Sequence, residues 1–122
     1  ASAIQKDYDF YLWLNDDTHL DEDALTRVYQ TYTEAAAQLG DAVIVVGSTR
    51  EQESGMMTYG GWRQCAGKLG SISWEKMAPN PDTWIACDTM NGNCVLIPRS
   101  VVPIAWVIWI MDCELQNPVV KL

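Results

Sequence analysis

The sequence is poor in residue types whose scarcity excludes whole classes of protein. Its 122 residues include a single histidine, and its four cysteines form no Cys-x-x-Cys pair. A structural zinc site needs clustered thiols and imidazoles, so a zinc-stabilised fold is not expected. Lysine and arginine total eight against sixteen acidic residues, which gives a formal net charge of −8. Because a nucleic-acid backbone requires clustered basic residues, we expect no nucleic-acid partner.

Long apolar runs are also missing. The densest run, residues 101–111, falls short of the roughly 20 residues that cross a bilayer and contains Pro103, so we expect no membrane span. The chain opens with neither a methionine nor an export leader, and we expect an interior piece of a longer protein. We interpret the cysteines as reduced thiols in the cytoplasm, although an even count also allows disulfides. The inner face of a membrane is an alternative location.

A hydrophobic content of 48% is enough to build a core, and no segment is repetitive. We therefore predict one α/β domain over residues 1–122, in which residues 102–122 form an atypical apolar tail.

The most informative segment is an apolar strand that runs directly into acidic residues. In residues 8–14, Tyr8, Phe10, Leu12 and Leu14 alternate with Tyr11 and Trp13, a pattern that predicts a strand buried on both faces at the centre of a sheet. Asn15, Asp16, Asp17 and Thr18 follow at once. Ligands of α/β sheets bind at the carboxyl ends of the strands, so this turn is a candidate site.

A helix is predicted next. Asp21 suits its N-cap, Glu22 and Asp23 suit its first turn, and Gly40 suits its end. Apolar residues at helical spacing define its buried face: Leu25, Val28, Tyr29, Tyr32, Ala35, Ala36 and Leu39.

Two further strands are predicted. Residues 42–46 are a β-branched run ending at Gly47, so the order strand, helix, strand indicates a βαβ unit with parallel strands. Residues 48–82 predict loops with one short hairpin. Residues 94–97 predict a strand between the turn Asn91-Gly92-Asn93 and Pro98.

The adjacent carboxylates of Asp16 and Asp17 repel one another unless a cation, a basic partner or open water offsets the repulsion. Mg²⁺ and Mn²⁺ prefer oxygen ligands and commonly use one or two protein carboxylates. A metal site is one interpretation, and a solvated turn that caps the next helix is the other. Asn91-Gly92-Asn93 is likewise open to interpretation as a plain hairpin turn.

Three segments, in this order along the chain, resemble family 2 glycosyltransferases with the GT-A fold. Residues 10–18 resemble that family's strand and DxD-type metal motif, and residues 58–63 are similar to a loop of one bacterial branch. Residues 87–99 resemble its later acceptor-side strand. The resemblance implies a partial GT-A-like (Rossmann-like) mixed sheet with flanking helices, in a chain that lacks the N-terminal nucleotide-binding half.

The resemblance also implies a reaction. A sugar would pass from a nucleoside diphosphate donor to the hydroxyl of a carbohydrate or lipid-linked acceptor, with inversion, as in bacterial polysaccharide biosynthesis. Mn²⁺ or Mg²⁺ would be held mainly by Asp17, with Asp16 and Asn15 beside it. Substrate contacts would come from Thr18, Gly60, Gly61, Trp62, Asn91, Gly92 and Asn93. Gly60-Gly61-Trp62 is equally compatible with a glycine turn before a core tryptophan.

The chain departs from the family after residue 102, where its general-base motif is not recognisable. Asp112 and Glu114 are weak candidates for that base, and we expect the isolated chain to be inactive. The alternative is a non-catalytic structural or protein-interaction module with a solvated acidic turn. Under either interpretation an open sheet edge predicts self-association.

Overall fold

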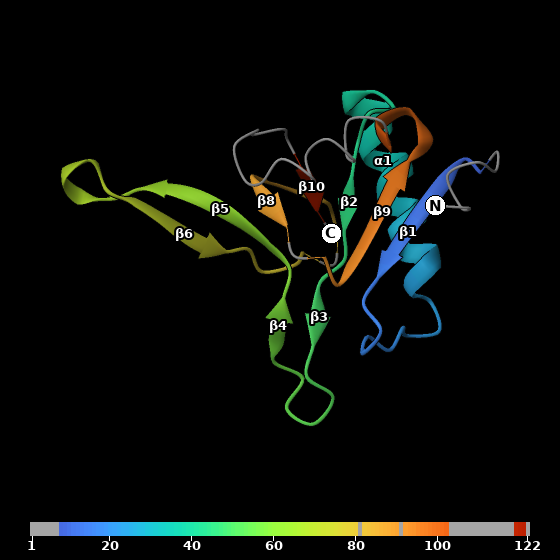
Figure 1. Cartoon of the computed structure of the whole chain (residues 1–122), viewed down its shortest axis with the longest axis horizontal. Helices are drawn as coiled ribbons and strands as arrows, with labels where there is room; N and C mark the ends of the chain where they lie inside the picture. Colours follow the sequence, from blue (N-terminus) through green and yellow to red (C-terminus); the bar gives the residue numbers. More distant parts are fainter. Residues whose placement is uncertain (1–7, 81, 91, 103–118, 122) are drawn as a thin grey trace.

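A computed structural model of the chain describes residues 8–80, 82–90, 92–102 and 119–121. These described residues form a mixed α/β structure in which helix α1 packs with several small sheets, as the sequence predicts at the level of fold class. The elements (Figure 1) are β1 Phe10–Leu14, α1 Ala24–Leu39, β2 Val45–Val46, β3 Thr49–Arg50, β4 Met57–Tyr59, β5 Gly61–Ala66, η1 Lys68–Gly70, β6 Ile72–Lys76, β7 Ile85–Cys87, β8 Thr89–Met90, β9 Cys94–Pro98, η2 Arg99–Val101 and β10 Val119–Lys121.

The largest sheet has the strand order β1-β9-β2-β10-β7. Strand β9 pairs antiparallel with both β1 and β2, whereas β10 pairs parallel with β2. Strands β1 and β2 therefore run in the same direction, as in a βαβ unit, but β9 lies between them. The sequence predicts that β1 and β2 are parallel neighbours, but in the structure each of them pairs with the antiparallel strand β9 instead.

Strand β1 lies at the edge of this sheet, so the prediction that residues 8–14 form its central strand is wrong. The alternation itself is confirmed: Phe10 and Leu12 pack against the cluster under α1, and Trp13 faces the other way. Trp13 is 39% exposed, however, and Leu14 is 38% exposed. An apolar strand next to a single neighbour keeps solvent contact at its open side, and a one-dimensional pattern does not reveal this.

All five residues of β9 are buried, and this strand holds the core together. Its alternate side chains serve two clusters, because successive residues of a strand face opposite sides of the sheet. Cys94 and Leu96 face α1, while Val95 and Ile97 pack with Val101 on the other side. The predicted strand at residues 94–97 is confirmed and extends through Pro98.

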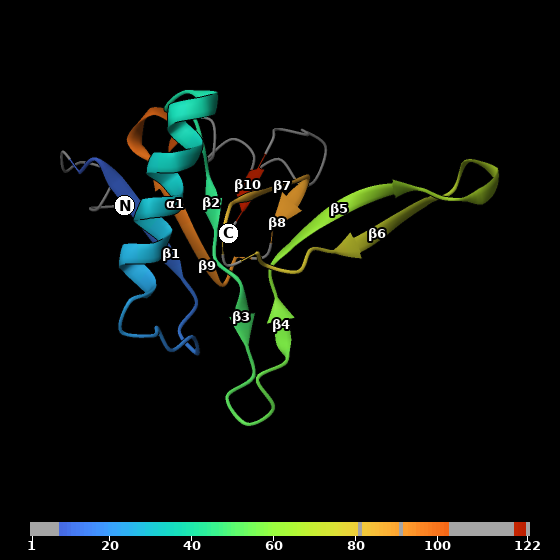
Figure 2. The ribbon, with the colours of Figure 1, turned by 180° about the vertical axis from the view of Figure 1, so that it is seen from behind.

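Helix α1 covers one face of the sheet (Figures 1 and 2) through Val28 and Ala35, which are both buried. Thr31 is buried beside them and donates a hydrogen bond from Oγ1 to the carbonyl of Arg27 at 2.9 Å. The ring of Phe10 lies edge-on to Tyr32, with 4.8 Å between the ring centroids. The buried face of α1 is therefore narrower than the predicted one, because Leu25, Tyr29 and Leu39 are exposed.

The predicted start of the helix is also wrong. The residue before α1 is Asp23, which makes no side-chain capping hydrogen bond, and the first turn contains no acidic residue. Asp21 instead accepts a backbone hydrogen bond from Ala24 through its carbonyl, at 3.0 Å. The end is as predicted: Gly40 has φ of 92°, a conformation that glycine adopts at little cost.

Between β2 and β7 the chain forms two hairpins where one was predicted. Strands β3 and β4 make a short hairpin, and β5 and β6 make a longer one that extends away from the main sheet (Figure 2). Strand β8 pairs with the start of β5, giving a three-stranded sheet of order β6-β5-β8. This pairing attaches the longer hairpin next to the Asn-Gly-Asn turn.

Candidate functional site

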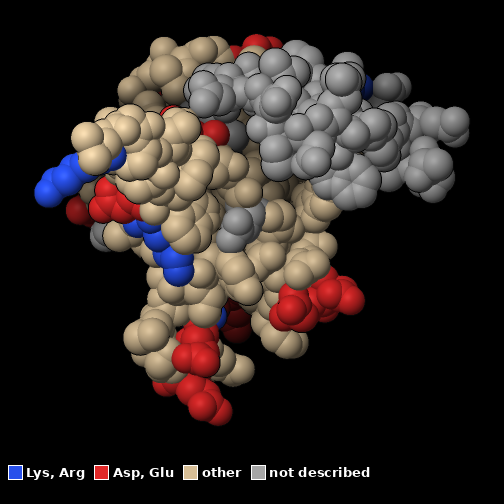
Figure 3. All heavy atoms as spheres, turned by 60° about the vertical axis from the view of Figure 1, so that its left-hand side comes forward, with Lys and Arg blue, Asp and Glu red and all other residues tan. Residues whose placement is uncertain are grey.

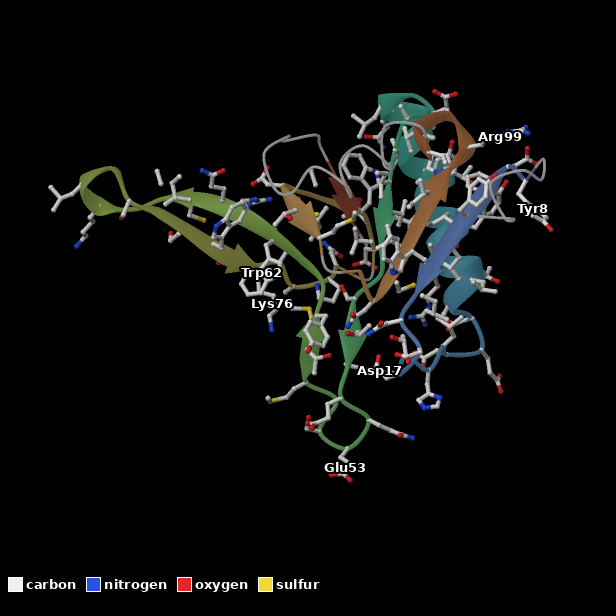
Figure 4. The ribbon with its side chains drawn as sticks, viewed as in Figure 1. Tyr8, Asp17, Glu53, Trp62, Lys76 and Arg99 are labelled. Atoms are coloured by element: carbon white, nitrogen blue, oxygen red, sulfur yellow. The ribbon has the colours of Figure 1, made fainter. Side chains whose placement is uncertain are left out.

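The acidic turn follows β1 directly and is held by hydrogen bonds of its own. The Asn15 side-chain amide donates from Nδ2 to Oδ1 of Asp17 at 2.9 Å. The backbone N–H of Thr18 donates to the carbonyl of Asn15 at 3.2 Å, which closes the turn. Asp16 and Asp17 are exposed and Thr18 is half-buried. In Figure 4, Asp17 lies at the lower end of the molecule.

Salt bridges occupy some of the acidic residues near this turn but not all of them. Asp21 contacts Arg50 of β3 at 3.0 Å, and Asp23 contacts Arg27 at 2.7 Å. Within the described part of the chain, Asp16 and Asp17 make no ion pair with a basic side chain. Figure 3 shows acidic atoms gathered in two groups at this end of the molecule. The two carboxylates are therefore open to solvent.

The donor set at the turn is small. Among the described residues, no group of three or more histidine, cysteine, aspartate or glutamate side chains is placed to hold a metal ion. Two carboxylates suit Mg²⁺ or Mn²⁺, which bind proteins through one or two carboxylates and complete their shell with water and substrate phosphate. Asn15, however, turns its amide nitrogen and not its oxygen toward Asp17. The chemistry of the residues thus fits these ions only as shared ligands with a substrate.

The turn that precedes β9 lies beside the acidic turn. The backbone N–H of Asn15 donates to the carbonyl of Asn93 at 3.2 Å, continuing the β1–β9 pairing by one step. Gly92 faces the indole of Trp13: a Cβ added at Gly92 would lie 3.6 Å from Trp13 Nε1. Two of the segments predicted to form the site are therefore adjacent, while Asn91 lies outside the described residues.

The third segment reaches the same region through β8. Gly60 and Gly61 are buried, and Trp62 pairs with Thr89, two positions before residue 91. Asp88 fixes this junction: its N–H donates to the carbonyl of Trp62 at 2.9 Å, and its Oδ2 accepts from the N–H of Gln64 at 2.8 Å. Sequence reasoning did not assign this role to Asp88.

Trp62 is half-buried, and one side of its ring carries a cation. Lys76 Nζ lies 5.7 Å from the ring centroid, within range of a cation–π contact, and donates to the carbonyl of Thr58 at 2.8 Å (Figure 4). A sugar or base that stacked on Trp62 would have to use the opposite side of the ring or displace Lys76.

A shallow cavity of about 220 Å³ lies on the face of the sheet opposite α1. Its lining is apolar and extends from the turn before β9 along that strand: Trp13, Met90, Gly92, Val95 and Ile97. Asp16 and Asp17 follow the lining residue Trp13 closely in the sequence, but they are not among the residues that line the cavity. Of the lining residues only Gly92 was predicted, although the alternation in β1 already places Trp13 on the face away from Phe10.

Among the described residues, Cys65, Cys87 and Cys94 are thiols that form no disulfide, in agreement with the prediction. Burial raises the pKa of the Cys94 thiol above its ordinary value. The pKa of Cys65 is also raised, by desolvation first and then by its hydrogen bond to Glu75, whose Oε2 lies 3.6 Å from the sulfur. Cys113 and the two weak candidates for a general base, Asp112 and Glu114, lie outside the described residues.

Comparisons with protein-family models, with curated proteins and with solved structures found no match to this chain. Among the residues that the structure describes, no helix combines the length and the apolar character needed to span a membrane.

Proposed function

We propose that this chain forms the metal-binding and acceptor-side part of a glycosyltransferase with a GT-A-like fold. The proposed enzyme transfers a sugar from a nucleoside diphosphate donor to an acceptor hydroxyl. The observation that supports this most directly is the hydrogen bond from the N–H of Asn15 to the carbonyl of Asn93. This bond connects two turns at the same end of the β1–β9 pair. One is the acidic turn, whose carboxylates suit a metal ion, and the other is the turn before β9, whose amide groups suit an acceptor.

In this proposal Asp17 and Asp16 hold Mn²⁺ or Mg²⁺, and Asn15 positions Asp17 through its side-chain hydrogen bond of 2.9 Å. The ion, when bound, would neutralise the charge that develops on the departing diphosphate. Thr18 closes the turn and keeps the carboxylates at the strand end. Rigid placement matters because electrostatic stabilisation is effective only where the charged groups need no rearrangement during the reaction.

The acceptor would lie along the apolar cavity beside Trp13 and Gly92. Aromatic side chains bind the apolar faces of sugars and lipid groups, and the indole of Trp13, which is 39% exposed, lines this cavity next to Gly92. The mixed directions of the strands in the main sheet are compatible with the proposed fold.

A titration tests the metal site. Mn²⁺ is titrated calorimetrically into the full chain, alone and with UDP, GDP or dTDP, and we expect binding that strengthens with one of the nucleotides. Asp17→Asn keeps the shape of the side chain but removes its charge, and should weaken Mn²⁺ binding at least about tenfold. Glu53→Gln is the matched control, because Glu53 is exposed on the neighbouring β3–β4 hairpin (Figure 4) and should leave binding unchanged.

Two results would contradict the proposal: no Mn²⁺ binding to the wild-type chain with any of the nucleotides, or equal losses in Asp17→Asn and Glu53→Gln. Equal losses would indicate a diffuse attraction of the cation to the acidic end of the molecule.

The second candidate function is a non-catalytic interaction module. It is favoured by the exposed apolar side chains of the β5–β6 hairpin, where Ile72 is 64% exposed and Trp74 is 49% exposed.

A further inference from the structure

The β5–β6 hairpin carries two large apolar side chains, Ile72 and Trp74, that are exposed in the described part of the structure. It extends away from the main sheet in both views of the ribbon (Figures 1 and 2). Directly opposed residues of an antiparallel pair share one face. Ile72 and Trp74 are two positions apart in β6, so these exposed apolar side chains lie on the same face of the hairpin. Their partners in β5, Ala66 and Gln64, lie on that face too.

The outer edge of this hairpin is the regular strand β6, which pairs with β5 alone among the strands that the structure describes. Strand β6 is the last strand in the order β6-β5-β8. The N–H of Met77 donates to the carbonyl of Gly61 at 2.9 Å, and the N–H of Gly67 donates to the carbonyl of Ser71 at 2.7 Å. Because hydrogen-bonded pairs alternate along an antiparallel ladder, the residues that direct their N–H and C=O groups outward are Ile72, Trp74 and Lys76.

We propose that β6 pairs with the β6 strand of a second copy of this chain, antiparallel about a twofold axis at Trp74. In this register Trp74 lies opposite Trp74, Ile72 opposite Lys76, and Ser73 opposite Glu75 of the second copy. The three outward-facing residues of each copy then form hydrogen-bonded pairs, about six hydrogen bonds in all. The result is one continuous sheet with both apolar faces on the same side.

A second copy is the occupant that fits best, because the strand is complementary to itself. The register places no like charges opposite each other: Glu75 meets a serine hydroxyl, and the aliphatic stem of Lys76 meets Ile72. The five residues of β6 include neither a proline nor a bulge, and its lysine, Lys76, directs its ammonium group back to the Thr58 carbonyl and the Trp62 ring. A membrane surface rich in anionic lipid fits less well, because the chain has a formal net charge of −8.

Two substitutions at Ser73 test the register, because they should change the dimer in opposite directions. Ser73→Lys places a cation opposite Glu75 of the second copy, and Ser73→Glu places a second carboxylate there. Both remove the same long hydrogen bond from Ser73 Oγ to the carbonyl of Cys65, 3.4 Å, so the loss of that bond is common to the two variants. Each altered pair occurs twice in a symmetric dimer, and we expect the dissociation constant to differ about tenfold between the two variants.

Sedimentation equilibrium over a concentration series supplies the measurement, with Ser54→Lys and Ser54→Glu as controls. Ser54 is exposed in the β3–β4 hairpin, so these controls reproduce both charge changes away from β6. The proposal predicts a wild-type dimer strengthened by Ser73→Lys, weakened by Ser73→Glu and unaffected at Ser54. A wild-type monomer at millimolar concentration, or a dimer insensitive to both changes at Ser73, would overturn it. So would a monomer that floats with phosphatidylserine vesicles, which would assign the hairpin to a membrane surface instead.

Discussion

Replacing Gly47 with alanine would add a methyl group where the chain after β2 passes closest to the buried strand β9. The N–H of Gly47 donates to the carbonyl of Cys94 at 2.9 Å, which fixes the two backbones together. A Cβ built at Gly47 would lie 3.0 Å from Cys94 Sγ and 3.2 Å from Cys94 Cβ. Apolar atoms normally approach to about 3.5–4.0 Å, so the added methyl is roughly 0.5 Å too close to the sulfur.

The expected cost follows from two opposing effects. Overpacking a core typically destabilises a protein by about 1–3 kcal/mol. The loss of glycine from the unfolded chain offsets about 0.4–1 kcal/mol of this. We therefore expect Gly47→Ala to lower the free energy of unfolding by about 1–2 kcal/mol, measured from the midpoint of urea unfolding at unchanged slope.

A double-mutant cycle identifies the contact responsible. Cys94→Ala removes the sulfur, so the double variant should be more stable than the sum of the two single effects predicts, by about 1 kcal/mol. Gly92→Ala is the matched control, because its added Cβ meets only the Trp13 indole, at the ordinary contact distance of 3.6 Å to Nε1. Gly47→Ala as stable as wild type, or a cycle that is additive, would refute the reasoning.

Two further predictions concern the thiols. The raised pKa of Cys94 means that the folded chain keeps this proton at a pH where the unfolded chain has lost it, so the free energy of unfolding should hold steady below the ordinary thiol value of 9.0 and fall above it. Urea unfolding of Cys94→Ala should show a smaller fall over the same range, and an equal fall in both proteins would argue against this. Glu75→Gln should lower the pKa of Cys65 and speed its reaction with a disulfide reagent at pH 8, as followed by mass spectrometry of the labelled peptide. An unchanged rate would mean that Glu75 does not act on the thiol.

The sequence predicted elements best where local pattern and burial agree. Strand β9 is recognisable because Cys94 to Ile97 are apolar and a proline follows, and α1 ends at Gly40 because glycine readily takes the positive φ found there. The start of α1 was misplaced because several acidic residues in a row are each suitable as a cap. Asp21 is engaged with Arg50, 29 positions away, and no local rule contains that contact.

Pairing between distant strands could not be predicted in the same way. The alternation in β1 correctly separates Phe10 from Trp13, but its place at the edge depends on β9, which comes much later in the sequence. The longer hairpin was not predicted because neither of its strands has a continuous apolar face. Polar residues follow Trp62 in β5 and flank Trp74 in β6, and most residues of both strands are at least partly exposed. Its signals were the glycines at 67 and 70 between two segments of similar length. The candidate site was predicted in part, since the positions of Asn15 and Asn93 beside each other depend on the same distant pairing.

The late position of β9 has a consequence for synthesis on the ribosome. Arg99, directly after β9, donates from its backbone N–H to the carbonyl of Asp9 at 2.9 Å, and its side chain contacts the Asp9 carboxylate, 90 positions away. At a typical elongation rate, roughly 5–20 s separate the emergence of these two residues from the exit tunnel. During that interval the nascent chain can form α1 but not the β1–β9 pair, so β1 remains accessible to chaperones until residue 98 has emerged from the tunnel.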